Sequence, residues 1–167
     1  AGALELEHGV LRLSRRPEVD IPDADLQPIE RQGPQRPAAL RLIDTDTVYA
    51  KIRFDAVTPR QLPRSLGTLE DPLARAVVWG SLWDMTRDAE LPVADYIDTV
   101  LTHLSAENQS TTLRTVLGTL QRALNSFSAP EQRASRRERA AHSLREAATR
   151  APAGSDQPLE IARAFAA

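Results

Sequence analysis

Hydrophobic and polar residues alternate along residues 1–55, the pattern of strands with one buried face. The alternation is clearest at residues 48–54, where Val48, Ala50, Ile52 and Phe54 form one set and Tyr49, Lys51 and Arg53 the other. Shorter runs of the same kind lie at Leu4–Glu7, Leu11–Leu13, Val19–Ile21 and Leu40–Leu42. Polar, Pro and Gly residues separate these runs, which favours about five short antiparallel strands. A sheet this thin is marginal alone, so we expect further strands before it or a helical cover on one face.

From Thr58 onward the apolar spacing changes to that of helices. Thr58-Pro59 and Asp71-Pro72 both combine an N-cap residue with proline at the first helical position, and the second predicts a helix to about Arg87. Leu91-Pro92 predicts the end of that helix and the start of the next one. The apolar stripe of this next helix consists of Val93, Ile97, Val100, Leu101 and Leu104.

The cleanest helical stripe comes next and consists of Leu113, Val116, Leu117, Leu120, Leu124 and Phe127. Ser128–Glu131 fits a second capping box, which predicts an arginine-rich helix to about Arg150. Residues 151–155 are a Pro/Gly linker, and a last short helix would hold Pro158 in its first turn.

These patterns predict an α+β chain with six helices. We expect residues 1–55 to form a partial antiparallel β-sandwich domain and residues 56–167 an all-α array of antiparallel helical hairpins, because short links force neighbouring helices to pack antiparallel. The chain ends on Phe165-Ala-Ala with no polar cap, so we expect that the natural protein continues.

Composition narrows the function classes. The net charge is −2, whereas a nucleic-acid reader carries a basic excess. The chain has no cysteine, which excludes thiol catalysis and zinc–thiolate sites. No apolar run approaches the ~18 residues of a membrane span, and the first ten residues lack the basic and apolar regions of a signal peptide. We therefore expect a cytoplasmic protein with no nucleic-acid and no membrane partner.

The aromatic and acidic residues of the first long helix have both structural and functional interpretations. Trp79 and Trp83 lie four apart beside Gly80, which could admit a second helix; core packing is the simpler interpretation, and ligand stacking the alternative. Asp84 lies three residues before Arg87 within an acidic helix end, which favours a surface ion pair over an acid–base pair.

The remaining polar groups give no recognisable reaction centre. His8, His103 and His142 stand in different segments, without the one-turn spacing of a helical zinc site. The arginines of residues 130–150 alternate with glutamates, such as the Glu146–Arg150 pair, so a solvated face with an alanine-rich underside is favoured over a phosphate-binding face. Neither a glycine-rich phosphate loop nor a Gly-x-Ser-x-Gly element occurs.

The run LRLIDTDTVYAKIRFD, at residues 40–55, resembles the end of the β-sandwich domain in the bacterial aminopeptidase N family of zinc metallopeptidases. Residues 73–80 and 83–91 resemble the opening helix of that family's C-terminal helical domain, and residues 154–159 and 163–167 a later segment. The resemblance implies the non-catalytic C-terminal part of such an enzyme, which walls the cavity where N-terminal residues are removed from peptides. Its partners would be the catalytic domain of the parent chain and the parent's peptide substrate.

The family's His-Glu-x-x-His and Gly-x-Met-Glu-Asn motifs do not occur here. Glu90 and Glu107 do not inherit their roles, because the surrounding residues do not match. We therefore predict no catalytic, cofactor-binding or metal-ligating residue in this chain, no cofactor of its own, and zinc in the parent enzyme only. The alternatives are a stand-alone helical protein-interaction module and an arginine-rich nucleic-acid binder.

Overall fold

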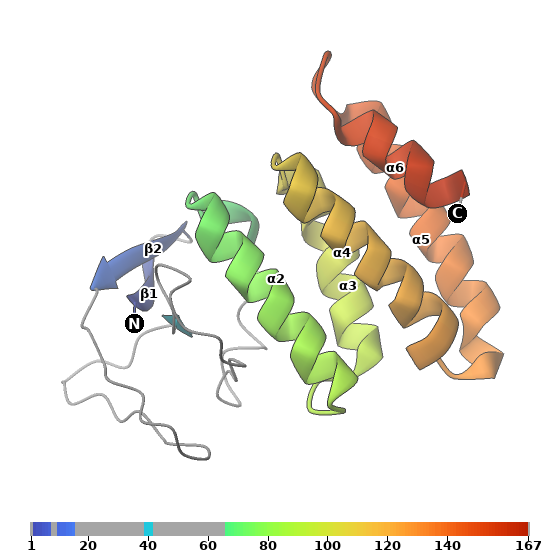
Figure 1. Ribbon diagram of the computed structural model, residues 1–167, viewed down its shortest axis with the longest axis horizontal. Helices are drawn as coiled ribbons and strands as arrows, with labels where there is room; N and C mark the ends of the chain where they lie inside the picture. Colours follow the sequence, from blue (N-terminus) through green and yellow to red (C-terminus); the bar gives the residue numbers. More distant parts are fainter. Residues whose placement is uncertain (1, 8–9, 16–38, 42–65, 167) are drawn as a thin grey trace.

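The computed structural model describes residues 2–7, 10–15, 39–41 and 66–166 (Figure 1). The first three ranges are the strands β1 (Gly2–Glu7), β2 (Val10–Arg15) and β3 (Ala39–Arg41). They form one antiparallel sheet in the order β2-β1-β3, with Leu4 opposite Leu13 and Leu6 opposite Leu11. The alternation of leucine with charged residues therefore does mark a hairpin.

The prediction of an α+β fold with a partial β-sandwich is wrong for the described residues. They contain no sandwich: the strands make a single layer whose third member has only 3 residues, and the region with described side chains consists of helices and their connections. A sandwich needs two sheets with interdigitating inner faces, and one hairpin with a short third strand supplies only one. The strands predicted at Val19–Ile21 and residues 48–54, the helix start at Thr58 and the domain boundary at residues 55–56 lie outside the described residues.

The first long helix, α2 (Pro72–Arg87), follows a short 3₁₀ turn, η1 (Leu66–Thr68). The predicted start is confirmed, because Pro72 is the first helical residue and the Asp71 carboxylate accepts the Leu73 N–H at 3.0 Å. The helix ends where the amides of Glu90 and Leu91 donate to the Met85 carbonyl, and Ala89, the residue before them, lies in the left-handed region at φ 62°. A left-handed residue after the last turn is the usual way to end a helix, although glycine normally occupies it.

Helices α3 (Val93–His103) and α4 (Ser110–Arg122), joined through the 3₁₀ turn η2 (Leu104–Ala106), form most of the core together with α2. The predicted stripes are confirmed, since their central members are buried against one another: Ile97, Val100, Leu104, Leu113, Val116, Leu117 and Leu120. Tyr96 is also fully buried. These helices therefore meet through the faces that the 3.6-residue period predicted.

A π-helical turn, η3 (Ala123–Phe127), closes α4 and breaks the predicted pattern. Its wider turn changes the angle between successive side chains, and Phe127 ends up 41% exposed instead of in the core. The predicted capping box at Ser128 is also wrong. Ala129 is the N-cap of α5 (Pro130–Arg150), and the Ser128 hydroxyl donates back to the Ala123 carbonyl at 2.9 Å.

The last helix, α6 (Gln157–Ala166), has Pro158 in its first turn as predicted and packs against both α4 and α5. The described residues contain five α-helices, and those of even number, α2, α4 and α6, run side by side in the same direction (Figure 1). Helices α3 and α5 run in the opposite direction, behind this row in the view of Figure 1. Within the described ranges, no helix is both long and apolar enough to cross a membrane.

Candidate functional site

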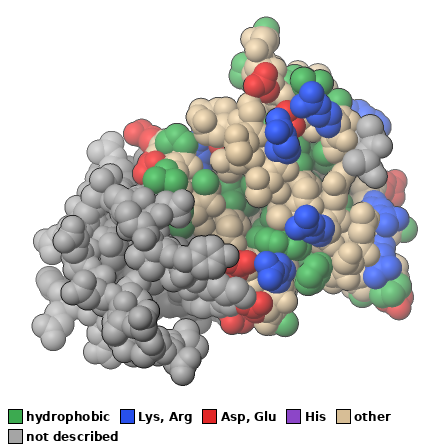
Figure 2. Space-filling model, in the orientation of Figure 1, with side chains coloured by type: hydrophobic (Ala, Val, Ile, Leu, Met, Phe, Trp, Pro, Cys, Tyr) green, Lys and Arg blue, Asp and Glu red, His purple; other side chains and the backbone are tan. Residues whose placement is uncertain are grey.

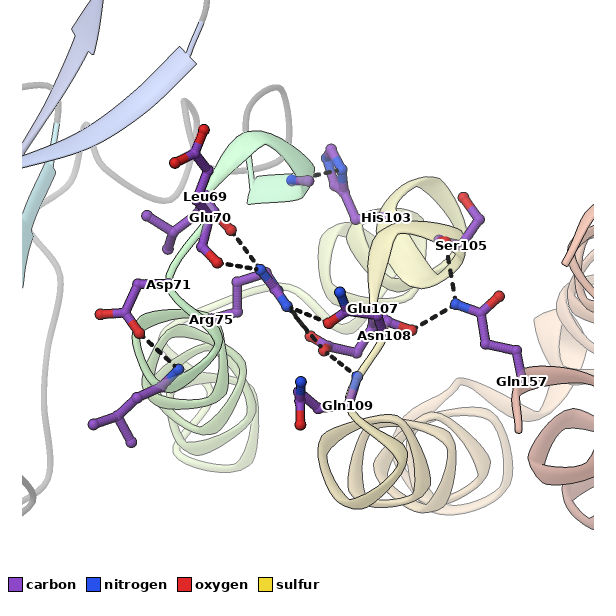
Figure 3. A network of polar contacts seen from close by, with 12 residues as sticks. Leu69, Glu70, Asp71, Arg75, His103, Ser105, Glu107, Asn108, Gln109 and Gln157 are labelled. Carbon is purple, nitrogen blue, oxygen red and sulfur yellow. Dashed lines mark hydrogen bonds and ion pairs between the residues drawn. The ribbon is translucent and has the colours of Figure 1, made fainter. Parts of the chain in front are cut away.

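A buried ion pair joins the start of α2 to the connection that precedes α4 (Figure 3). The Arg75 side chain is on the second turn of α2, and Glu107 follows η2; they are 6% and 1% exposed. Arg75 Nε donates to Glu107 Oε2 at 3.2 Å and Nη2 donates to Oε1 at 3.3 Å. This fork suits arginine and carboxylate, and a pair buried so deeply needs such geometry to offset its lost hydration.

Every other donor of the Arg75 guanidinium is also satisfied. Nη1 donates to the carbonyls of Leu69 and Glu70 at 2.6 and 3.1 Å, and Nη2 donates to Asn108 Oδ1 at 2.9 Å. Since arginine has five N–H donors, the residue is fully engaged. It therefore ties the segment before α2 to the segment before α4.

The same cluster extends to α6 through the backbone of the α3–α4 connection. Gln157 Nε2, at the first residue of α6, donates to the carbonyl of Glu107 at 2.6 Å and to that of Ser105 at 3.2 Å. Figure 3 shows Gln157 reaching this connection from the side opposite Arg75. We call Arg75, Glu107, Asn108 and Gln157, with their carbonyl partners, the Arg75 cluster. Its groups bind one another, which suits it to fixing helix positions and leaves it no free base for proton transfer.

A second, shallower cluster joins α4 to α6; we call Arg114, Glu160 and Arg163 the Glu160 cluster. The Glu160 side chain, 4% exposed, accepts two hydrogen bonds from Arg114, at 3.1 and 2.9 Å, and one from Arg163 at 2.8 Å. The Arg114 hydrogen bonds hold the pKa of Glu160 below its ordinary value, and desolvation opposes this shift. The same bonds raise the pKa of Arg114. The Ser110 hydroxyl donates to Asp156 Oδ2 at 2.6 Å and adds a further link between these helices.

The histidines do not come together. His103 Nδ1 accepts the Gly67 N–H at 3.2 Å, and a side chain at Gly67 would meet that nitrogen at 3.0 Å, so the glycine permits this close approach. His142 lies on α5, 3.6 Å from a Glu146 oxygen, and His8 is outside the described residues. Over the ranges that the structure describes, no three His, Cys, Asp or Glu side chains are placed to hold a metal ion.

The two tryptophans of α2 pack in the core, as their simpler interpretation predicted. Both are buried, and the Trp83 ring lies 5.4 Å from Tyr96 and 5.3 Å from Phe127, centroid to centroid. Burial raises the pKa of Tyr96 to about 12, while its hydrogen bond with Thr119, at 2.6 Å, opposes the rise. Among the described residues, no atom outside α2 lies within 4 Å of the position that a Cβ at Gly80 would take, so the close helix approach that this glycine could admit is not seen there.

The predicted ion pairs form at the surface. Arg87 Nη1 lies 3.3 Å from Asp84 Oδ1, and Arg150 Nη2 lies 3.1 Å from Glu146 Oε2. Arg139 pairs with Asp98 on α3. Figure 2 shows basic side chains dispersed among hydrophobic and acidic ones over the helical part of this face, which is not the continuous basic stripe of a phosphate-binding surface.

Sequence reasoning missed the Arg75 cluster. The available signal was an arginine inside the apolar run Leu73–Trp79, because a charge on an otherwise buried helix face needs a partner. The partner is 32 residues away, so no local spacing identifies it. The sequence only excludes Glu107 from the zinc-motif roles of the family, and in the structure its carboxylate accepts hydrogen bonds from Arg75.

Comparison with known proteins places the chain in a family. The family model for the ERAP1-like C-terminal domain matches residues 44–167. Aminopeptidase N of Streptomyces lividans is 36% identical over 168 residues, an alignment that covers 99% of this chain and 20% of the relative. The chain therefore spans about a fifth of the length of this relative.

Proposed function

Because the chain belongs to the ERAP1-like C-terminal domain family and is a C-terminal fragment of an aminopeptidase N-like protein, we propose that it acts as a wall of the parent enzyme's substrate cavity. It packs against the catalytic domain of that chain and restricts which peptides reach the catalytic centre. The reaction is removal of N-terminal residues from peptides, and the zinc ion that it requires is held by the catalytic domain. The parent works in the cytoplasm.

The observation that carries this proposal is similarity over the whole chain to one fifth of a protein named as an aminopeptidase. The structure adds a physical reason for a shaping role. The Arg75 cluster and the Glu160 cluster each fix the start of one even-numbered helix to the next. A surface built on helices whose relative positions are fixed can keep its shape when a substrate contacts it.

The first test asks whether the chain itself catalyses peptide-bond hydrolysis. The chain, supplied with zinc and an aminoacyl-anilide, should give no turnover above a zinc blank. Hydrolysis that disappears with a chelator would refute the non-catalytic assignment.

The second test addresses the cavity wall. The parent enzyme with and without the residues of this chain should be compared on an aminoacyl-anilide and on a series of longer peptides. We expect the shortened enzyme to change the ratio of kcat/KM for long and short substrates, because an opened cavity no longer selects by length. An unchanged ratio, with retained activity, would refute the wall.

A further inference from the structure

An apolar groove with one basic residue at its rim lies where α4, α5 and α6 meet. Its volume is about 290 Å³. The floor consists of the buried leucines Leu117 and Leu120 from α4, Leu124 from the π turn and Leu144 from α5. Ligand pockets are mostly apolar with a few polar groups, and about 300 Å³ is the lower end of their size range. The groove therefore suits a small ligand that is largely hydrocarbon.

The polar rim favours a negative charge. Arg137 Nε and Nη2 both donate to Asn125 Oδ1, at 3.1 and 2.7 Å. Asn125 is uncharged, so this contact holds the guanidinium at the groove without neutralising it. Among the described residues no carboxylate pairs with Arg137, whereas Arg139 and Arg150 on the same helix pair with Asp98 and Glu146; of the α5 arginines without an ion pair, Arg137 is the one that lines the groove.

Three of the five donors on Arg137 remain uncommitted within the described part of the chain. They include both donors of Nη1 and one of Nη2, which is the arrangement that a carboxylate can accept with two oxygens. A single carboxylate at the rim would thus replace water on two of these three donors of the exposed Arg137 and balance its charge.

We propose that this groove binds a medium-chain monocarboxylate, with the acyl chain on the leucine floor and the carboxylate on Arg137. A partner helix fits less well. One helical turn, roughly 10 Å across and 5.4 Å long, occupies more volume than the groove provides. This inference goes beyond the cavity-wall proposal and does not depend on it, because the groove and its charge lie within this chain.

The test is an NMR titration of the isotope-labelled chain with octanoate, kept below its micellar concentration. We expect saturable shifts of the leucine methyl groups on the floor and of the Arg137 Nε–H signal. Octanol, which has the same chain without the charge, should shift the same methyl groups but bind at least tenfold more weakly.

Three variants separate the role of the charge from the role of the cavity. Arg137→Gln should weaken octanoate binding about tenfold and leave octanol binding unchanged, whereas Arg145→Gln, on an exposed residue of the same helix outside the groove, should change neither. Ala141→Leu, at a half-buried position of the lining, should weaken both ligands by filling space.

Three results would overturn the proposal: no saturable shift at the floor leucines, equal octanoate affinity of the Arg137→Gln variant, or equal affinity of octanol and octanoate. Sedimentation at the titration concentrations supplies a fourth. A concentration-dependent dimer that shifts the floor leucine methyl signals by itself, and whose formation abolishes the octanoate shifts, would show that a second copy of the chain covers the groove.

Discussion

The buried Arg75–Glu107 pair should control the stability of the helical region far more than any exposed ion pair. Replacement by Arg75→Met keeps a long side chain but removes all five donors. The Glu107 carboxylate then retains only the N–H of Gln109, at 3.1 Å, and the buried Leu69 carbonyl loses the arginine that bonds it at 2.6 Å. Removing one partner of a buried ion pair costs about 3–5 kcal/mol, and we expect about 4 kcal/mol here.

The matched control is the exposed pair on the same helix, Arg87 with Asp84. Their side chains are 48% and 28% exposed and 3.3 Å apart. Exposed pairs of this kind contribute about 0–1 kcal/mol, so Arg87→Met should destabilise by less than about 1 kcal/mol. The two substitutions remove the same chemical group from one helix and differ mainly in burial.

Urea unfolding followed by fluorescence of the buried tryptophans in α2 would measure both variants. A double-mutant cycle with Glu107→Leu isolates the pair. Because the double variant buries no unpaired charge, it should be more stable than Arg75→Met alone, with a coupling energy of about 2 kcal/mol or more. If Arg75→Met costs no more than Arg87→Met, or if the cycle shows no coupling, the Arg75 cluster is not the fixed point inferred from its geometry.

Further predictions concern single residues. Ala89→Gly should stabilise the chain by about 1 kcal/mol, because φ 62° suits glycine, whereas Ala134→Gly in α5 should destabilise it by a similar amount; thermal melts giving both the same sign would contradict this. Glu160→Gln should lower stability at neutral pH. The lowered pKa of Glu160 stabilises the fold above the unfolded-state pKa, and this contribution is lost as pH falls through the folded-state value. The difference from the unsubstituted chain should therefore shrink in acid, and a pH-independent difference would contradict the assignment. Tyr96, with its pKa raised to about 12, ionises later in the folded than in the unfolded state, so its stabilising contribution is lost as pH rises from about 10 to 12. Tyr96→Phe should abolish the late ultraviolet phenolate step, and retention of that step would assign it elsewhere.

The local signals in the sequence predicted the helices well. Asp71-Pro72 located the start of α2, because capping and proline chemistry act within one turn. The apolar stripes of α3 and α4 identified their buried faces, since helical period and burial are directly linked. These predictions needed no knowledge of the partner helices.

Features set by the packing of distant segments could not be predicted in the same way. Phe127 fits the α4 stripe at 3.6 residues per turn, but the chain there adopts a π turn. Ser128 fits a capping box, yet its hydroxyl bonds Ala123, and it also accepts from Arg136 Nη1 at 3.0 Å. The alternating pattern located the strands β1 and β2 correctly. The sandwich prediction failed because alternation alone does not show whether a second sheet exists.

The two arginine–carboxylate clusters repeat one construction along the row of helices. Arg75 is the fourth residue of α2 and bonds Glu107, just before α4; Arg114 is the fifth residue of α4 and bonds Glu160, the fourth residue of α6. In each case an arginine near one helix start bonds a buried carboxylate near the start of the next helix of the same direction (Figure 1). Hydrophobic packing is non-directional and tolerates small sliding between helices, whereas a two-pronged hydrogen bond fixes their offset. The repeated pairs therefore align α2, α4 and α6 at one edge, and that alignment gives the proposed wall a defined shape.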